Sequence, residues 1–369
     1  MLKVPQGNQS NQFKQTSGSK GYKHISEIYQ EGIDHIIGRR NGTIKSIVTP
    51  WQDFNDAGID GLEWNTITVV AGRPASGKTL VVNQLTRESF DLNPGEDFCV
   101  LDHQWEMLGR TMAVREFSSK FDKTMRELNS AGGYKLSDAE IAEIKHYVAT
   151  RTNVPIYIVE KPKTVEQFER DTEKFIMEDM MGKKTIVTVD HSILFRQGAS
   201  ESEKFDTLYN LGEALTRMKK KLPITFIVLS QLNRSVESEN RLKEGSASNY
   251  LLDGDVFGGD ALLMHADMLL MINRPAKYNI KKYGNHEFQV GPNDLAFHFN
   301  KVRNGDPRLI FFEAQFAKMR VVPYSPNKYG ERMPINKYSG LSQQQGTPNP
   351  VAPAGGNLIS LKNINNNFK

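Results

Sequence analysis

From about Ile44 onward, short runs of apolar residues alternate with longer amphipathic segments. The runs are rich in β-branched side chains and predict six strands, at residues 66–71, 97–101, 155–159, 185–190, 224–230 and 266–272. Helices are expected between most of them, two with capping-box spacing, Ser137 with Glu140 and Thr164 with Gln167. Because continuous apolar strands alternate with helices, we expect an α/β fold whose mostly parallel sheet is covered on both faces.

The last patterned segment does not continue the alternation of strands with helices. In "LAFHFNKVRNGDPRLIFFEAQFAKMRV", residues 295–321, two apolar runs flank the turn-forming sequence NGDP. This pattern predicts antiparallel strands at the end of the domain.

Both ends of the chain lack such patterns. Residues 1–22 are rich in Gln, Asn, Ser, Gly and Lys and predict a flexible arm, and residues 326–369, with "QQQGTPNPVAPAGGN", predict a disordered tail. Between the arm and the domain, "HISEIYQEGIDHIIGRRNG" places five isoleucines at helical spacing before Gly42. We therefore expect an isolated amphipathic helix and a connection at residues 23–43, and one α/β domain at residues 44–325.

Composition and charge restrict the class of protein. The chain has 38% hydrophobic and 24% charged residues, no apolar run near the roughly 20 residues that cross a bilayer, and a polar N-terminus without a signal-peptide core. We expect a cytoplasmic protein without a membrane partner. The single Cys99 excludes an internal disulfide and a cysteine-based zinc site. The net charge of +4 permits nucleic-acid binding without requiring it.

A phosphate-binding loop lies between the first predicted strand and the following helix. The sequence "GRPASGKT", residues 72–79, fits the pattern G-x-x-x-x-G-K-[ST] completely. In such loops the glycines let backbone amides wrap the phosphates, the lysine reaches the β and γ oxygens, and the hydroxyl binds Mg²⁺. The residues expected to bind the nucleotide are Gly72, Arg73, Pro74, Ala75, Ser76, Gly77, Lys78, Thr79 and Leu80, with Lys78 also catalytic and Thr79 also a metal ligand.

The Mg²⁺ site also needs a carboxylate at the end of a neighbouring strand, and two strands offer one. Asp190 ends the apolar run "TIVTV", whereas Asp102 ends "FCVL" and is followed four residues later by Glu106. This arrangement suggests that one aspartate holds the metal while Glu106 polarises the attacking water. A histidine follows each aspartate, but no further ligands for a transition-metal site are apparent, so neither His103 nor His191 is predicted to bind a metal.

Together these motifs resemble the ATPase domain of DnaB-type replicative helicases, a RecA-fold family, over about residues 24–322. "HQWEM" is similar to the segment that carries the family's catalytic glutamate, which implies that role for Glu106. "IVTVDHSILF" is similar to the family's magnesium motif, in which Tyr normally follows the Asp, and this implies that Asp190 is the metal ligand. "ITFIVLSQLNRSVE" resembles the motif whose glutamine senses the γ-phosphate, which implies that role for Gln231.

The resemblance extends to residues that would act on a neighbouring subunit. "FNKVRNGDPR" resembles the turn from which Lys and Arg reach the adjacent nucleotide, so Lys301 and Arg303 become candidates to act in trans. The helix at about 24–39 looks like the family's linker helix, which docks on the next subunit. The region before Gly72 is too short for the family's N-terminal primase-binding domain, and Met264-His265 replaces the family's Gln-Asp.

The resemblance implies an ATP- and Mg²⁺-dependent, hexameric DNA helicase that moves on single-stranded DNA at the replication fork, with a loader or primase as a possible partner. DNA-binding loops are expected at residues 196–204 and 235–254, where Arg234, Arg241 and Lys243 could contact phosphates and Tyr250 is the aromatic residue. Lys219–Lys221 are interpreted as cations that complement a helix dipole. The alternatives are a RecA-type recombinase, a helicase loader of the same fold, or a nucleotide-binding regulatory protein without turnover.

Overall fold

The computed structural model describes residues 22–198, 201, 203–324 and 335–336. Nearly all of the predicted N-terminal arm and C-terminal tail lies outside the described residues. The chain divides into two compact units, Met1–Ser46 and Ile47–Lys369. Within the described ranges, no helix combines the length and the apolar character that a membrane span requires.

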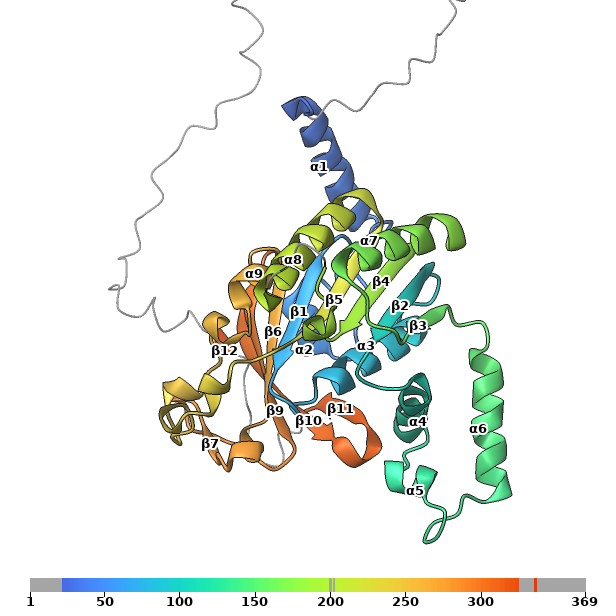
Figure 1. The fold of residues 1–369 in the computed structure, drawn as a ribbon, viewed down its shortest axis with the longest axis vertical. Coiled ribbons are helices and arrows are strands. Elements are labelled where there is room, and N and C mark those ends of the chain that lie inside the picture. Colours follow the sequence, from blue (N-terminus) through green and yellow to red (C-terminus); the bar gives the residue numbers. More distant parts are fainter. Residues whose placement is uncertain (1–21, 199–200, 202, 325–334, 337–369) are drawn as a thin grey trace, which may run out of the picture. The chain divides into compact units, whose positions relative to one another are not determined.

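In the part of the chain that the structure describes, ten strands form one sheet (Figure 1). Nine of them follow the order β11-β10-β9-β6-β1-β5-β4-β2-β3, and β12 pairs with β10. The strands are β1 Ile67–Gly72, β2 Phe98–Gln104, β3 Ile156–Val159, β4 Lys184–Asp190, β5 Ile224–Gln231, β6 Met268–Asn273, β9 Asp294–Val302, β10 Arg308–Gln315, β11 Arg320–Pro323 and β12 Ile335–Asn336. The short strands β7 Lys282–Tyr283 and β8 Phe288–Gln289 form a separate pair.

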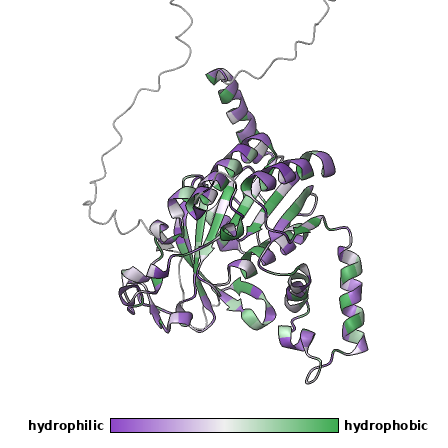
Figure 2. Ribbon diagram, viewed as in Figure 1, coloured by the Kyte–Doolittle hydropathy of each residue, from purple (hydrophilic) through white to green (hydrophobic). Residues whose placement is uncertain are grey.

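The predicted strand pattern is confirmed. All six predicted strands are present and pair in parallel, whereas β9, β10 and β11 add antiparallel strands at one edge. The central strands β1 and β5 are buried on both faces, which explains why they read as continuous apolar runs. Figure 2 shows this apolar character along the sheet.

Helices pack on both faces of the sheet. α7 Val165–Lys174, α8 Lys204–Lys221 and α9 Gly259–Leu263 bury apolar side chains with one face, and α2 Gln52–Ala57 and α3 Lys78–Leu92 do so with the other. Both predicted capping boxes are present, at the starts of α6 Asp138–Arg151 and α7. Together with α4 Gly109–Lys120 and α5 Met125–Asn129, α6 forms the connection between β2 and β3.

The first unit contains the predicted isolated helix. α1 Ile25–Arg40 begins with a capping box at His24, and the chain turns at Gly42, whose φ of 72° suits glycine. The isoleucines at its helical positions are all exposed, and their exposed fractions range from 43% to 67%. α1 therefore carries a row of exposed apolar side chains.

Candidate nucleotide-binding site

The phosphate-binding loop follows β1 and leads directly into α3. Parallel pairing aligns Gly72 at the end of β1 with Gln231 at the end of β5, and Gln104 at the end of β2 with Asp190 at the end of β4. Four segments far apart in the sequence thus end at the same edge of the sheet. Gly77 caps α3 with φ 97°, a conformation that favours glycine.

Lys78 is buried at the first position of α3 and folds back onto the loop. Its Nζ donates hydrogen bonds to the carbonyl oxygens of Gly72, at 2.8 Å, and Arg73, at 3.2 Å. Burial lowers the pKa of Lys78 to about 8, although the Asp190 and Glu106 carboxylates oppose that shift. A phosphate oxygen would replace the two carbonyl acceptors and favour the charged form of the lysine.

Thr79 and Asp190 form the pair that would hold Mg²⁺. The Thr79 hydroxyl donates to Oδ2 of Asp190 at 2.6 Å, and Oδ1 of Asp190 is buried without a hydrogen-bond partner. Burial raises the pKa of Asp190 to about 6, and the hydrogen bond from Thr79 partly opposes this. A hard cation bound by oxygen ligands would satisfy the orphaned Oδ1, so these residues fit Mg²⁺.

Glu106 lies just beyond the end of β2 and extends into solvent. Its carboxylate Oε2 is 3.9 Å from Nε2 of His191, the residue that follows Asp190. The same Nε2 is 3.3 Å from Nε2 of Gln231. Burial lowers the pKa of His191, although the Glu106 carboxylate opposes that shift, and this favours the neutral ring. His191 therefore lies near both Glu106, the predicted base, and Gln231, the predicted sensor of the γ-phosphate.

One cavity of about 400 Å³ brings most of these residues together. From the predicted set it is lined by Pro74, Ala75, Gly77, Lys78, Thr79, Leu80, Glu106 and Gln231. The remaining loop residues, Gly72, Arg73 and Ser76, do not line the cavity. The guanidinium of Arg73 forms an ion pair with Glu237 at 2.8 Å, and the hydroxyl of Ser76 is buried. Asp190 does not line the cavity itself, but its carboxylate accepts a hydrogen bond from Thr79, which does.

Sequence reasoning assigned no role in nucleotide binding to six residues that line the cavity: Met107, Arg115, His191, Arg274, Phe316 and Met319. Arg115 of α4 has a buried Nε without a partner, and the guanidinium of Arg274, after β6, lies 4.0 Å from the ring centre of Phe316, after β10. A stacked guanidinium and aromatic ring present flat surfaces of the kind that bind a nucleobase. No short motif marks these positions, because Arg274 and Phe316 are brought together only by the antiparallel strands.

The model for the DnaB-like helicase C terminal domain matches residues 46–320 of the chain. The chain belongs to the DnaB-like helicase family. It is 24% identical over 267 residues to the replicative DNA helicase DnaB of Buchnera aphidicola subsp. Acyrthosiphon pisum, covering 72% of this chain and 55% of that protein. It is 22% identical over 320 residues to the corresponding protein of Geobacillus stearothermophilus, covering 82% of this chain and 66% of that protein. The chain thus spans about half to two thirds of these relatives.

Two solved structures share the RecA-like fold. One, an ATPase domain, superimposes with a TM-score of 0.69 at 18% identity, over 83% of this chain and 100% of that chain. A DnaB-like replicative helicase, from a study of its interactions with primase, superimposes with a TM-score of 0.65 at 18% identity, over 82% of this chain and 71% of that chain.

The two residues predicted to act in trans do not line the nucleotide cavity. Arg303 is half exposed, and its Nη1 lies 3.0 Å from Oδ1 of Asp267. Lys219 binds the other oxygen of Asp267 at 2.5 Å, so it has a specific partner beyond the helix dipole that the sequence suggested. Lys301 donates to the carbonyl oxygen of Leu263 at 2.7 Å. Neither cation faces the phosphate loop of its own chain.

The sequence placed Asp102, the alternative metal ligand, at the end of a strand, and this placement was wrong. β2 continues past Asp102 to Gln104, so Asp102 lies inside the strand and not at its end. Its Oδ2 accepts a hydrogen bond from Arg87 of α3 at 3.2 Å, and its Oδ1 accepts from Gln104 at 3.0 Å and from Thr188. These bonds occupy both oxygens of Asp102, which leaves Asp190 as the carboxylate beside the loop.

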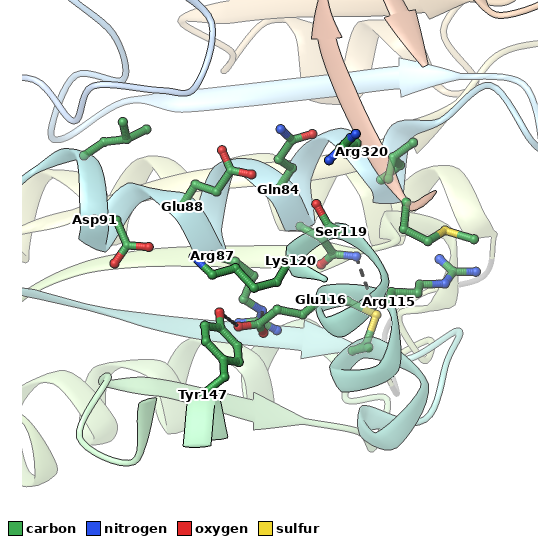
Figure 3. A pocket seen from close by; sticks show the side chains of 15 residues that line it. Gln84, Arg87, Glu88, Asp91, Arg115, Glu116, Ser119, Lys120, Tyr147 and Arg320 are labelled. Atoms are coloured by element: carbon green, nitrogen blue, oxygen red, sulfur yellow. Dashed lines mark hydrogen bonds and ion pairs between the residues drawn. The ribbon is translucent and has the colours of Figure 1, made fainter. Parts of the chain in front are cut away.

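Arg87 continues this polar network into a second cavity, of about 340 Å³, between α3 and α4. Figure 3 shows Tyr147 of α6 donating to Glu116, which also lies 3.5 Å from Nε of Arg87. The cavity shares Arg115 with the nucleotide site. Through its bond to Arg87, Asp102 thus helps to position α3, the helix that follows the phosphate loop.

His103 packs in an aromatic cluster. Its ring lies edge-on to Trp105 and Phe168, at centroid distances of 5.5 and 5.0 Å, and burial lowers its pKa to about 3. His103 is thus separated from the cavity that His191 lines. That neither histidine binds a metal stays a prediction.

The predicted DNA-binding loops need one correction. Arg241 is turned inward, because its guanidinium binds both oxygens of Asp255 at 2.7 and 2.8 Å and the carbonyl oxygens of Ser248 and Tyr250. It is therefore not available to contact phosphates. Arg234 and Lys243 are exposed. The other loop, at residues 196–204, lies partly outside the described residues.

Proposed function

We propose that the chain is the ATP-driven motor of a ring-forming replicative DNA helicase. The observation that carries the proposal is the single cavity around which Lys78, Thr79, Glu106 and Gln231 meet, with Asp190 bonded to Thr79. Membership of the DnaB-like helicase family supports ATP as the nucleotide and DNA unwinding as the work done. Because the chain spans only part of its relatives, the whole activity is a proposal for this chain.

The loop residues bind and hold the triphosphate. Lys78 leaves the carbonyls of Gly72 and Arg73 for the β and γ oxygens, and the backbone amides from Ala75 to Thr79 surround the phosphates. Thr79 and Asp190 hold Mg²⁺, which neutralises phosphate charge when it is bound. Arg274 and Phe316 hold the base of the nucleotide.

Glu106 orients and deprotonates the attacking water. Its exposed carboxylate extends from the strand end next to Asp190, so it can accept a proton from a water near the γ-phosphate. Gln231 donates from its amide to the γ-phosphate. Together the two residues let the protein distinguish the triphosphate from the diphosphate.

Lys301 and Arg303 complete the site of a neighbouring subunit in a homo-hexamer. Arg303 is half exposed and lies outside its own cavity, which supports a role in trans. A cation delivered to the γ-phosphate stabilises the charge of the transition state, an effect of about 10³- to 10⁵-fold in rate. The exposed isoleucines of α1 support docking of this helix on an adjacent subunit.

Single-stranded DNA passes through the ring and contacts exposed cations. Arg196 and Lys243 are exposed and belong to the two loops expected to face DNA, and the exposed Arg234 directly precedes the second loop. Contacts to phosphates give binding that does not depend on base sequence and weakens with salt. A loader or primase remains a further proposed partner.

The test compares ATP hydrolysis and fork unwinding, with and without single-stranded DNA, in the native chain and in Glu106→Gln. The variant is expected to bind ATP but to lose at least about 100-fold in turnover. Glu178→Gln is a matched control, since Glu178 is an exposed glutamate whose nearest cation is 4.0 Å away. A native chain without DNA-stimulated hydrolysis would contradict the helicase assignment, and an active Glu106→Gln variant would contradict the base.

A further inference from the structure

His191 occupies the point of the nucleotide cavity where the proposed base and the proposed sensor come closest. Its side chain is 9% exposed, and its Nε2 lies 3.3 Å from the amide of Gln231 and 3.9 Å from the carboxylate of Glu106. Its Nδ1 is buried and has no hydrogen-bond partner.

The buried Nδ1 determines which nitrogen carries the proton. A neutral imidazole has one N–H donor and one acceptor nitrogen. A buried N–H without a partner is rarer than an unpaired acceptor, so the proton belongs on Nε2. Nε2–H then has two acceptors within reach, the side-chain oxygen of Gln231, once its amide turns that atom toward the ring, and the carboxylate of Glu106.

A single N–H cannot serve both acceptors fully. While Gln231 takes the hydrogen bond, the exposed Glu106 carboxylate has no donor from the ring to hold it. When Gln231 turns toward a γ-phosphate, the N–H becomes free for Glu106. The proton stays on Nε2 throughout, and only its acceptor changes.

We propose that His191 is a positioning residue that couples phosphate sensing by Gln231 to placement of the base Glu106. The inference rests on the proposed function, because it assigns the order of events within the same site. With triphosphate bound, His191 holds Glu106 in its working position. After hydrolysis the side-chain oxygen of Gln231 again accepts the hydrogen bond from Nε2–H of His191, and the Glu106 carboxylate loses that donor.

The test uses His191→Phe, which keeps a ring but removes the N–H, and His191→Gln, which places an amide N–H near the original Nε2. Four quantities are measured: kcat and KM for ATP with single-stranded DNA, the Kd of a fluorescent ATP analogue with Mg²⁺, and the thermal midpoint. His103→Phe is the matched control, since His103 follows the other Asp and lies in the aromatic cluster outside the cavity.

His191→Phe is expected to lower kcat at least tenfold while the Kd changes less than twofold and the thermal midpoint is kept. His191→Gln is expected to recover kcat to within about threefold of native. In the Gln231→Ala background, His191→Phe is expected to add little further loss, because the coupling is already broken.

Native kcat in His191→Phe would overturn the inference, and so would equal impairment of the Phe and Gln variants. A fall in the nucleotide affinity or thermal midpoint that matches the loss of kcat would also overturn it in favour of a packing role. These results differ from failure of the proposed function, in which the native chain itself shows no DNA-stimulated turnover.

Discussion

Asp190 and Asp102 are both 1% exposed, yet their replacement by asparagine is expected to change stability in opposite directions. In the metal-free protein, Asp190→Asn removes a carboxylate that burial destabilises and leaves a side chain that still accepts the Thr79 hydrogen bond. Asp102→Asn instead removes the anion that faces the buried guanidinium of Arg87.

The magnitude for Asp190 follows from its proton affinity. Its pKa rises from an ordinary 3.8 to about 6 in the folded chain. At about 1.4 kcal/mol for each tenfold change in proton affinity, the ionised group costs the folded state about 3 kcal/mol at pH 7.5. Because the folded pKa is raised, native stability should increase as pH falls from about 6 toward 4, and the advantage of Asp190→Asn should fall by about half at pH 5.

For Asp102→Asn the expected change is a loss of about 3 kcal/mol. Breaking a buried ion pair leaves one charge uncompensated, which costs about 3 to 5 kcal/mol. Glu116 remains 3.5 Å from Arg87, so the lower end of that range is expected.

The assay is urea unfolding in EDTA at one protomer concentration, followed by tryptophan fluorescence at pH 7.5 and pH 5. Asp190→Asn should unfold at higher urea than the native chain at pH 7.5, and Asp102→Asn at lower urea. If Asp190→Asn loses stability at pH 7.5, or if its difference from native does not depend on pH, then the Asp190 carboxylate is not destabilised by burial.

Three further predictions address the site. Phe316→Ala and Arg274→Ala should each weaken ATP binding about tenfold, by competition binding, while inorganic triphosphate binds as before, because only the base loses its stacking surface. Arg303→Ala and Glu106→Gln, each expected to be nearly inactive alone, should recover part of the native ATPase activity when mixed, because some interfaces then join an intact Glu106 to an intact Arg303 of the neighbour, and no recovery in the mixture would contradict action in trans. Gly72→Ala should lower stability by about 1 to 3 kcal/mol in urea unfolding, because its Cβ would lie 2.9 Å from the carbonyl oxygen of Ile272, whereas Gly132→Ala, with no atom within 4 Å, should be neutral.

The local pattern of the chain was sufficient to predict much of the fold. Buried parallel strands need apolar side chains on both faces, so β1, β4 and β5 appear as unbroken apolar runs in the sequence. The phosphate loop is equally local, because its glycines and Lys78 act within one turn between a strand and a helix. The antiparallel pair β9 and β10 was likewise visible from the turn between its apolar runs.

The apolar pattern did not distinguish the two aspartates, since each ends an apolar run and precedes a histidine, and in the sequence only the family resemblance pointed to Asp190. The tertiary structure supplied the physical reason. β2 continues past Asp102 and binds it to Arg87, whereas β4 ends at Asp190 beside Thr79. The stacked pair of Arg274 and Phe316 and the meeting of His191 with Gln231 and Glu106 also have no sequence signature. Such contacts depend on the order and register of strands, which long-range packing selects and no local spacing encodes.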